Sequence, residues 1–596
     1  MKKIYIAFLF LSLCGGQVYP QCTNEWVNYG NPPKKNFGQG TSSGNAVTTD
    51  VSGNIIVAGQ FRDSLTLNDG TLITPGTNGF LHSFTIKYDP SGNLLWYKIG
   101  KSTNSSKPAD VSDVITDNSG NIYVLGKCWP DFIDFDGTTI ACGFGQCMNE
   151  IFLAKYNPSG TVQWVFRTKT SVNKDHRPGG IALKSNGNIV ITGTFAGTII
   201  FGSISLSGTG GDYNAFLAEI DPSTGNPVWA KYLFDASFYG GNLGEAASVA
   251  VDNSDNIYIT GDIQSTNVIL GNDTLLWGNL YIVKTDPSGN VIWGRGYKTN
   301  CGDNEAEEIR ISGNKLYVAA RAGLNCSSNA YFISGTDTFS IGACAAATPQ
   351  SGFIIKADFS GAVENMFCVG IPGSGTSSKY AKPVAMEINA AGNVVVTGIY
   401  NVNIYFSGDT LYPGTGSIWD TYIASFDSSG NFLWAKSATN GGTNGKQTEA
   451  KDVAVFGDKV YVTGYFSDTT MFGSIPVSLK GDKDYFLWNV CDTTFVTSSE
   501  ENATDFSSLT LSPNPASGEF TVSGFPFAVQ TIEAINVLGE VILSKTINLA
   551  ETVSNGGSSN QQTINISGFP AGIYVVRIIS ARENGISASR KIIIQR

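Results

Sequence analysis

Charged residues are scarce in this sequence, and histidine is almost absent. Only 15% of the 596 residues are Asp, Glu, Lys or Arg, and the 49 acidic residues outnumber the 38 basic ones, so that the formal net charge is -11. Proteins that bind nucleic acid or anionic lipid concentrate positive charge on one face. The composition therefore argues against a nucleic-acid partner.

Motifs that carry catalysis are also lacking. The two histidines, His82 and His176, are far apart in the chain, and no HExxH, GxSxG, phosphate-loop or DxDxDG pattern occurs. Turns such as Asp117–Asn121 contain acidic and amide side chains, but in such turns these side chains bind their own backbone. The sequence predicts neither a metal site nor a cofactor, and it favours a protein that is not an enzyme.

Long hydrophobic runs are missing as well. The longest apolar stretch near the N-terminus, Ile4–Leu13, follows Lys2 and Lys3 and is about half the length of a membrane span, which needs roughly 20 residues. A short apolar run after two lysines is typical of a secretory signal peptide. We predict a signal peptide at residues 1–21, export from the cytoplasm, and no membrane span.

Glycine and aromatic residues are abundant. The chain contains 69 Gly, 34 Phe, 24 Tyr and 10 Trp, a composition typical of antiparallel strands joined by tight turns. An all-β fold is therefore expected.

An internal repeat with a period of about 67 residues runs through most of the chain. Its first segment is a hydrophobic strand, a tight turn and a second strand ending in glycine, as in VITDNSGNIYVLG. Seven copies occur, at Val47–Gly59, Val114–Gly126, Ile181–Gly193, Val249–Gly261, Ile309–Ala320, Met386–Gly398 and Val453–Gly464. Seven copies predict seven equivalent structural units.

A second repeated segment supplies two more strands. FLAKYNPSGTVQW at Phe152–Trp164 has relatives that place a tryptophan at 96, 229, 293 and 434, with Met366 in the fifth repeat. Four strands per repeat are typical of a β-propeller blade. The matching strand of the seventh repeat, at Trp26, precedes the first repeat, so we expect the N-terminal strand to complete the last blade and close the ring.

The repeats resemble the seven-bladed β-propeller repeat family of exported bacterial proteins, in which a DxxGNxYVTG strand pair alternates with FLAKYDxxGNxxW. The resemblance covers roughly Thr23 to Cys491, and we predict the propeller domain at residues 22–491. It implies a seven-bladed β-propeller.

A different pattern follows the repeats. Residues 492–508 are polar and read as a linker. Residues 509–596 contain short strands between Gly and Pro turns, which predict a small Ig-like β-sandwich. Leu511–Ala516 (LSPNPA), the VLGEV at 537–541, the GIYVV at 572–576 and the basic end resemble the type A C-terminal sorting domain of type IX secretion substrates. That resemblance implies recognition by the type IX secretion machinery and a secreted or cell-surface location.

One set of charged residues recurs at the same repeat position, at the expected entry of each innermost strand. The set is Ser43, Asp110, Arg177, Glu245, Glu305, Lys382 and Glu449. These side chains are predicted to ring one mouth of the central channel, and two interpretations are open. They form a ligand or cation site, or they form ion pairs between blades, Asp110 with Arg177 and Lys382 with Glu449 or Glu305, which we favour.

The cysteines fit an oxidising compartment rather than a zinc site, because none has CxxC spacing. Cys22 and Cys491 flank the predicted seam of the ring. We predict a disulfide between them.

Two functions remain compatible with the sequence. The first is a non-catalytic binding or adhesion protein that holds an extracellular glycan or protein on its loops. The second is a secreted polysaccharide-acting enzyme, a lyase or hydrolase, with its site at the channel mouth. The absence of catalytic motifs favours the first, although a fold by itself does not determine function.

Overall fold

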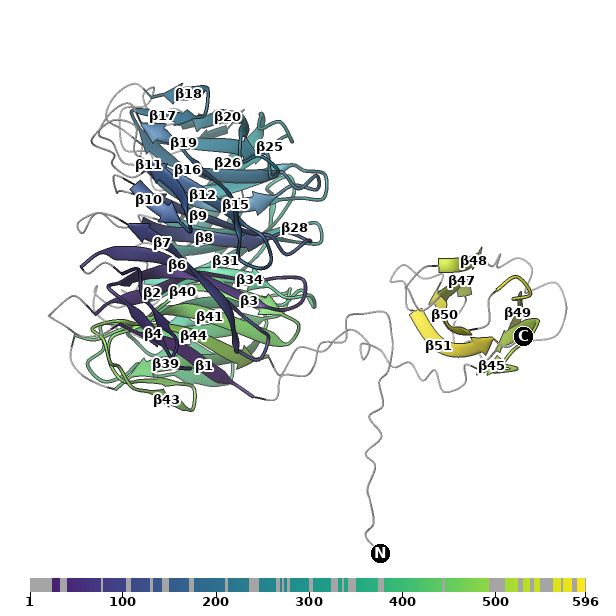
Figure 1. The fold of residues 1–596 in the computed structure, drawn as a ribbon. Helices are drawn as coiled ribbons and strands as arrows, with labels where there is room; N and C mark the ends of the chain where they lie inside the picture. The colour runs from purple at the N-terminus through teal and green to yellow at the C-terminus, as the bar shows by residue number, and fades with distance from the viewer. Residues whose placement is uncertain are drawn as a thin grey trace, which may run out of the picture. The chain divides into compact units, whose positions relative to one another are not determined.

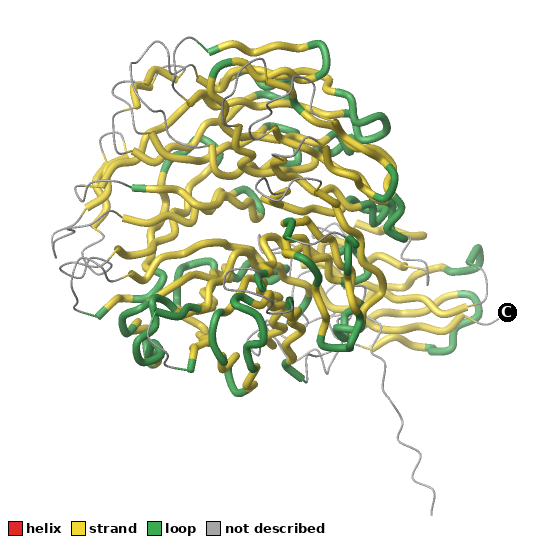
Figure 2. The backbone as a smooth tube through the Cα atoms, turned by 60° about the vertical axis from the view of Figure 1, so that its left-hand side comes forward, coloured by secondary structure: helices red, strands yellow, loops and turns green. Residues whose placement is uncertain are grey.

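The structure is a computed structural model, and every regular element it describes is a β-strand (Figure 2). It describes residues 24–32, 40–76, 79–102, 109–128, 132–141, 150–170, 176–208, 213–234, 246–263, 268–270, 273–275, 279–299, 304–322, 331–334, 337–340, 350–373, 380–441, 445–492, 510–523, 529–535, 541–546, 561–569, 572–580 and 587–594. The predicted signal peptide and most of the predicted linker lie outside these ranges. Gln21–Phe495 form one compact unit, and Val496–Arg596 belong to another.

Seven strands form the innermost layer of the first unit, one from each repeat. They are β2 (Ser42–Thr49), β8 (Ala109–Thr116), β15 (His176–Leu183), β21 (Ala246–Val251), β27 (Glu305–Ser312), β34 (Tyr380–Ile388) and β40 (Thr448–Phe456). Each contacts the next in this order, and β40 contacts β2. The seven strands therefore close a ring around a central channel, as a β-propeller requires.

Two further layers of strands lie outside this ring, and each pairs antiparallel with the layer inside it. The second layer is β3 (Ile55–Arg62), β9 (Ile122–Cys128), β16 (Ile189–Ala196), β22 (Ile257–Ile263), β28 (Lys315–Ala322), β35 (Val394–Tyr400) and β41 (Lys459–Phe466). The third is β6 (Leu81–Tyr88), β12 (Glu150–Tyr156), β19 (Tyr213–Ile220), β25 (Asn279–Thr285), β31 (Gln350–Asp358), β38 (Asp420–Phe426) and β44 (Asp484–Cys491). These strands are buried on both faces, because neighbouring blades cover them.

The outer layer completes four strands per blade. It consists of β7 (Leu94–Ser102), β13 (Val162–Arg167), β20 (Pro227–Phe234), β26 (Val291–Thr299), β32 (Val363–Cys368), β39 (Phe432–Asn440) and, in the last blade, β1 (Trp26–Asn31). We number the blades 1 to 7 from β2 to β40. The β-propeller fold is confirmed, and the seven four-stranded groups are consistent with the predicted seven blades.

The chain ends meet in blade 7. Strand β1 pairs antiparallel with β44, with Val27 opposite Trp488, so a strand from the N-terminus completes the sheet of the last repeat. In Figure 1 the purple β1 lies among the green strands of the C-terminal repeats. This ring closure was expected from the circular shift of the repeats, and it removes an open sheet edge.

Short hairpins join neighbouring blades. Each lies between the second and third strands of its own blade: β4 (Leu65–Leu67) and β5 (Leu72–Ile73), β10 (Phe132–Phe135) and β11 (Thr138–Ala141), β17 (Thr198–Phe201) and β18 (Ile204–Ser207), β23 (Val268–Leu270) and β24 (Asp273–Leu275), β29 (Tyr331–Ser334) and β30 (Asp337–Ser340), β36 (Ile404–Phe406) and β37 (Asp409–Leu411), β42 (Thr470–Phe472) and β43 (Ile475–Val477). Six of them extend the outer edge of the preceding blade. They pair with β1, β7, β14 (Lys169–Thr170), β26, β33 (Ile371–Pro372) and β39.

The repeated tryptophan also joins neighbouring blades. The indole nitrogen of Trp96 in blade 1 donates to the carbonyl oxygen of Pro158 in blade 2, 3.1 Å away, and Lys87 donates to the same oxygen. Gly160 lies above the Trp96 ring with a φ of +83°, and a Cβ atom there would come within 2.9 Å of the ring. The Pro-Ser-Gly turn and the tryptophan are therefore two halves of one contact between blades.

The C-terminal unit is a small β-sandwich. One sheet contains β45 (Thr510–Ser512), β46 (Glu519–Ser523) and β49 (Gln561–Asn565), and the other contains β47 (Val529–Ile535), β48 (Val541–Thr546), β50 (Gly572–Ser580) and β51 (Ser587–Ile594). Phe520 and Ile564 from the first sheet share a hydrophobic core with Ile532 and Val576 from the second. Two antiparallel sheets packed on one core form the sandwich expected from the sequence.

Candidate binding site in the central channel

The predicted charged ring lies at one end of the channel. Ser43, Asp110, Arg177, Glu305, Lys382 and Glu449 all lie within the first three residues of an innermost strand. Glu245 lies outside the described residues. Because the innermost strands run side by side in the ring, these residues mark one channel mouth.

The acids of this ring find their partners inside their own blades. The Asp110 carboxylate lies 3.8 Å from the Lys127 ammonium, Glu305 forms an ion pair with Arg321, and Glu449 forms one with Lys451. Asp110 faces Lys127 directly across the β8–β9 ladder, as Glu305 faces Arg321 across β27–β28. The Cβ atoms of directly opposed residues in a ladder lie about 5 Å apart, so each acid can reach a partner within its own blade.

The favoured pairing between blades was therefore wrong in detail. The Arg177 guanidinium lies 4.7 Å from the centre of the Tyr213 ring in its own blade, and no ion pair joins Arg177 to Asp110. Within the part of the chain that the structure describes, Lys382 pairs with neither Glu305 nor Glu449. One contact does cross between blades, since the Asn45 amide donates to Asp110 over 2.8 Å.

Deeper in the channel lies a second set of charges that sequence reasoning missed. Asp113 in blade 2, Glu308 in blade 5 and Asp452 in blade 7 occupy the same position of the repeat, immediately after a β-bulge of the innermost strand. A bulge re-aims the side chains that follow it. Simple alternation along the strand therefore could not place these residues, although their shared repeat position was visible in the sequence.

Each of the three acids binds the next blade. Asp113 accepts from the backbone N–H of Ile181 at 3.2 Å, Asp452 accepts from Val47 at 2.7 Å, and Glu308 accepts from Met386. The three residues that donate these N–H groups again share one repeat position. We call Asp113, Glu308 and Asp452 the channel acids. Each one connects its own innermost strand to that of its neighbour.

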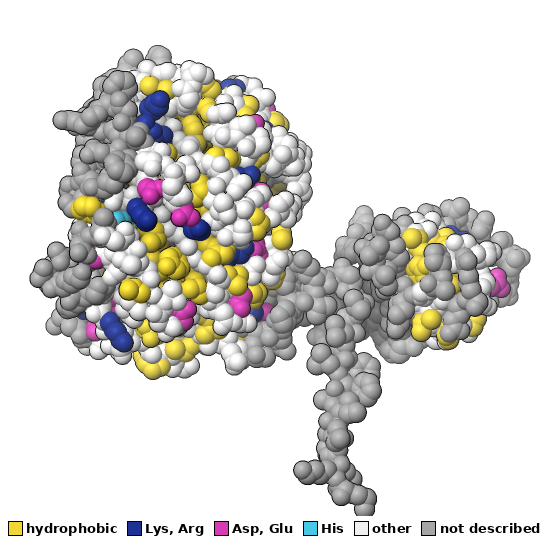
Figure 3. All heavy atoms as spheres, in the orientation of Figure 1, with side chains coloured by type: hydrophobic (Ala, Val, Ile, Leu, Met, Phe, Trp, Pro, Cys, Tyr) yellow, Lys and Arg dark blue, Asp and Glu magenta, His cyan; other side chains and the backbone are white. Residues whose placement is uncertain are grey.

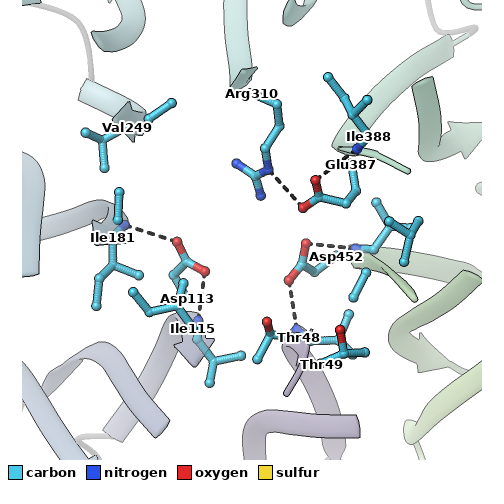
Figure 4. A pocket seen from close by; sticks show the side chains of 17 residues that line it. Thr48, Thr49, Asp113, Ile115, Ile181, Val249, Arg310, Glu387, Ile388 and Asp452 are labelled. Atoms are coloured by element: carbon cyan, nitrogen blue, oxygen red, sulfur yellow. Dashed lines mark hydrogen bonds and ion pairs between the residues drawn. The ribbon is translucent and has the colours of Figure 1, made fainter. Parts of the chain in front are cut away.

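An arginine and a fourth acid lie beside them. The Arg310 guanidinium contacts Glu308 and donates from Nε to Glu387, 3.1 Å away. Figure 4 shows Asp113, Arg310, Glu387 and Asp452 pointing toward one another from four different strands. A cavity of about 350 Å³ lies among them, lined by residues of all seven innermost strands.

Burial changes the titration of this group. Burial raises the pKa of Asp113 to about 6, and it also raises the pKa values of Glu308 and Asp452. Repulsion between neighbouring carboxylates adds to the effect at Asp452, and Arg310 opposes it. The channel therefore holds carboxyl groups that are partly protonated near neutral pH.

Comparison with known proteins identifies the C-terminal unit. Residues 510–595 match the family model described as the secretion system C-terminal sorting domain. This unit is a type IX secretion sorting domain. The sorting domain was expected from its motifs, and it indicates that the protein is secreted or held at the cell surface. Among the described residues, no helix is long and apolar enough to span a membrane.

The propeller has a distant relative in sequence. The chain is 25% identical over 511 residues to an uncharacterized WD repeat-containing protein of Acanthamoeba polyphaga mimivirus. The matched region covers 72% of this chain and 35% of that protein. The chain thus spans about a third of the length of this relative.

Solved structures give weaker similarity. An inactive variant of virginiamycin B lyase from Staphylococcus aureus is 11% identical, with a TM-score of 0.33 over 78% of this chain and 99% of that one. A quinohemoprotein alcohol dehydrogenase from Comamonas testosteroni is 10% identical, with a TM-score of 0.34 over 75% of each chain. Likeness at this level says nothing about activity, and the strand pairing described above defines the fold.

Proposed function

We propose that this protein is a non-catalytic binding or adhesion protein, exported by type IX secretion, whose β-propeller holds an extracellular glycan or protein. The sorting domain accounts for export, and the propeller is the part left to act outside the cell. Acidic and basic side chains are interspersed on the face drawn in Figure 3, which favours polar recognition over a single-sign electrostatic surface.

The backbone hydrogen bonds accepted by the channel acids are the observation that supports this proposal. A general acid or base must reach a substrate proton, directly or through one water. Asp113 and Asp452 each accept two backbone N–H groups, one from their own strand and one from the next blade. Carboxylates held in this way connect blades, which suits a rigid scaffold better than proton transfer.

The histidines support the same conclusion. His82 is fully buried, and its Nδ1 accepts from the backbone N–H of Ser102 at 3.0 Å. Burial lowers the pKa of His82 to about 4, so its imidazole is neutral and inaccessible. His176 is also fully buried, against Phe195.

One observation favours the alternative of a polysaccharide-acting enzyme. Raised pKa values cluster at functional sites, and glycosidases use two carboxyl groups that flank the scissile bond. Asp113 and Glu387 face one cavity (Figure 4), and the pKa of Asp113 is raised by burial. A secreted lyase or hydrolase would use these residues.

A glycan array and an activity screen on the same sugars separate the two functions. We expect the mature protein to bind at least one glycan class without cleaving it, and the Asp113→Asn variant to bind as the parent does. Release of reducing ends or unsaturated products by the parent, lost in Asp113→Asn and in Glu387→Gln, would establish the enzyme instead.

A further inference from the structure

A group of basic side chains gathers at the channel mouth on blades 5, 6 and 7. It consists of Arg321 on β28, Lys382 on β34, Lys451 on β40 and Lys483, which directly precedes β44. We call these four residues the basic cluster. Lys382 interacts electrostatically with both Arg321 and Lys451, and Lys483 interacts with Lys451, so the four charges share one neighbourhood. In a chain with a net charge of -11 such a concentration of cations stands out.

Three acids near the cluster form ion pairs with two of its cations. Arg321 forms ion pairs with Glu305 and Glu307. Glu449 forms an ion pair with Lys451 and also accepts from the Tyr465 hydroxyl. Because three carboxylates face the four cations of the cluster, the group keeps one net positive charge.

Two lysines of the cluster, Lys382 and Lys483, have no carboxylate within ion-pair distance among the residues that the structure describes. Neither Lys382 nor Lys483 forms an ion pair with any residue that the structure describes. Burial lowers the pKa of Lys382 and repulsion from Arg321 adds to this effect, while attraction to Glu307 and Glu449 opposes it. Burial likewise lowers the pKa of Lys483, while attraction to Glu449 opposes this shift and repulsion from Lys451 adds to it. An anion bound beside these lysines would offset the burial of their charges and the repulsion from their basic neighbours.

Aromatic side chains hold the cluster and border it. The Lys483 ammonium lies 4.2 Å from the centre of the buried Tyr465 ring, within the range of a cation–π contact. The Gln447 amide donates to the Tyr465 hydroxyl. The backbone of Gln447 also forms an isolated parallel β-bridge with the backbone of Trp419. Trp419 packs edge-to-face with Tyr380 at 6.3 Å and is only partly buried. Lysines in the same neighbourhood as an indole suit a sugar ring that carries an acidic group.

We propose that the basic cluster is the subsite of this propeller for an acidic glycan, with Lys382 and Lys483 binding a carboxylate or sulfate group and Trp419 packing against the sugar. This inference rests on the proposed function and names its ligand class. Carboxylated and sulfated glycans share the anionic chemistry that the cluster recognises. An acidic protein offers the same charges without the sugar ring.

Calorimetry with the mature full chain tests the proposal. The probes are a polyuronate, a sulfated glycan, a neutral glycan of matched length and poly-glutamate. The test variant is Lys382→Gln with Lys483→Gln, and the matched control is Lys101→Gln with Lys169→Gln, two exposed lysines on outer-layer strands. A Lys382→Arg, Lys483→Arg variant keeps the charge and checks that the site still folds.

We expect at least one acidic glycan to bind, with affinity reduced at least tenfold by the Gln pair and unchanged in the control and Arg variants. Binding should weaken as salt is raised, because charge attraction is screened. Whether the polyuronate or the sulfated glycan binds better identifies the anion.

Three outcomes would overturn the proposal. Binding of only the neutral glycan would refute the acidic subsite and leave the proposed binding function standing. Binding of poly-glutamate without any glycan would show that the cluster takes acidic protein. Equal affinity in the parent and the Gln pair would place the acidic-glycan site elsewhere.

Cleavage of a bound acidic glycan would instead refute the non-catalytic function, and loss of its binding in the Gln pair would still confirm the subsite.

Discussion

At the scale of single residues, the channel acids are carboxyl groups whose pKa values are raised by burial. Removing a carboxylate from water disfavours its charged form, and a neighbouring carboxylate adds to the cost. Asp113 and Asp452 meet both conditions, and backbone N–H groups compensate only in part. Their protonation state is therefore linked to the stability of the ring.

This linkage predicts that the propeller is more stable at mildly acidic pH than at alkaline pH. The pKa of Asp113 is about 6 in the folded protein and near 3.8 otherwise, so the folded state binds more protons between these values. The free energy of unfolding then decreases as pH rises from about 4 to about 7. Denaturant unfolding at pH 5 and pH 8 measures it, and equal midpoints would contradict it.

The Asp113→Asn variant assigns the effect to one group. Val114 and Ile181 donate to different oxygens of the Asp113 carboxylate, so the single amide oxygen keeps one of these two hydrogen bonds, and the amide cannot ionise. We expect the free energy of unfolding to change less between pH 5 and pH 8 in the variant than in the parent, by about 1–2 kcal/mol. Asp89→Asn is the matched control, because the pKa of Asp89 is shifted in the opposite direction to that of Asp113. Although burial opposes it, hydrogen bonds from Asn93 and Ser91 lower the pKa of Asp89, so its replacement destabilises at neutral pH.

At the scale of elements, contacts between blades repeat around the ring. The indole of Trp164 in blade 2 donates to Pro222 of blade 3 at 3.0 Å, and its ring would meet a Cβ placed on Gly225 at 2.7 Å. Lys155 donates to the same Pro222 oxygen at 2.8 Å. The FLAKY-PSG-W pattern thus encodes contacts between blades as much as strands within a blade.

We predict that Trp164→Ala lowers the free energy of unfolding by about 2 kcal/mol, because it removes a half-buried ring and a hydrogen bond between blades. Gln163→Ala changes the adjacent exposed side chain and should alter stability by less than about 0.5 kcal/mol. Chemical denaturation of both variants provides the measurement. Equal effects would show that the tryptophan does not join the blades.

The seam between β1 and β44 supports the predicted disulfide. Cys22 lies outside the described residues, so the pairing stays a prediction. Glu25, three residues after Cys22, accepts from the backbone N–H of Cys491 at 3.3 Å, and its carboxylate forms an ion pair with Lys436. The chain just after Cys22 is therefore held against Cys491.

Non-reducing peptide mapping of the mature protein should find Cys22 joined to Cys491. A bond that closes nearly the whole propeller restricts the unfolded chain strongly, so Cys22→Ser should cost about 3–5 kcal/mol. Alkylation of Cys22 without prior reduction would refute the bond. Cys128, a buried free thiol with a pKa raised by burial to about 12, should resist alkylation until the protein unfolds.

At the scale of the whole molecule, the propeller and the sorting domain each have their own core. The propeller is complete at Asp492, whose carboxylate accepts from the Trp434 indole at 2.7 Å and which is almost fully buried. This residue, predicted as the start of the linker, therefore belongs to the propeller. The sorting domain packs its two sheets on each other.

We predict that the sorting domain is needed for export and not for folding or binding. A chain ending at Asp492 should fold, bind as the full protein does, and stay in the periplasm of a host with type IX secretion. Thr510–Arg596 fused to an unrelated periplasmic protein should carry it outside. Fractionation and immunoblotting measure both outcomes. Export of the truncated chain, or its failure to fold, would make the C-terminal domain part of the working protein.

The sequence by itself determined the architecture, because repetition carries the information. A blade cannot bury its aromatic faces alone, so seven copies of one four-strand pattern imply a ring, and the displaced strand at Trp26 implies how the ring closes. The sorting domain was equally accessible, because its motifs are local in the chain.

Only the tertiary structure decided which charges meet. A bulge in each innermost strand turns Asp113 and Asp452 into the channel. Cross-strand neighbours pair with Asp110 and Glu305, and Lys451 on the same strand pairs with Glu449, so all three acids find partners within their own blades. Strand alternation and sequence spacing fix positions along a blade. Side-chain partners depend on bulges and on the register between strands, and these are set by the packing of blades around the channel.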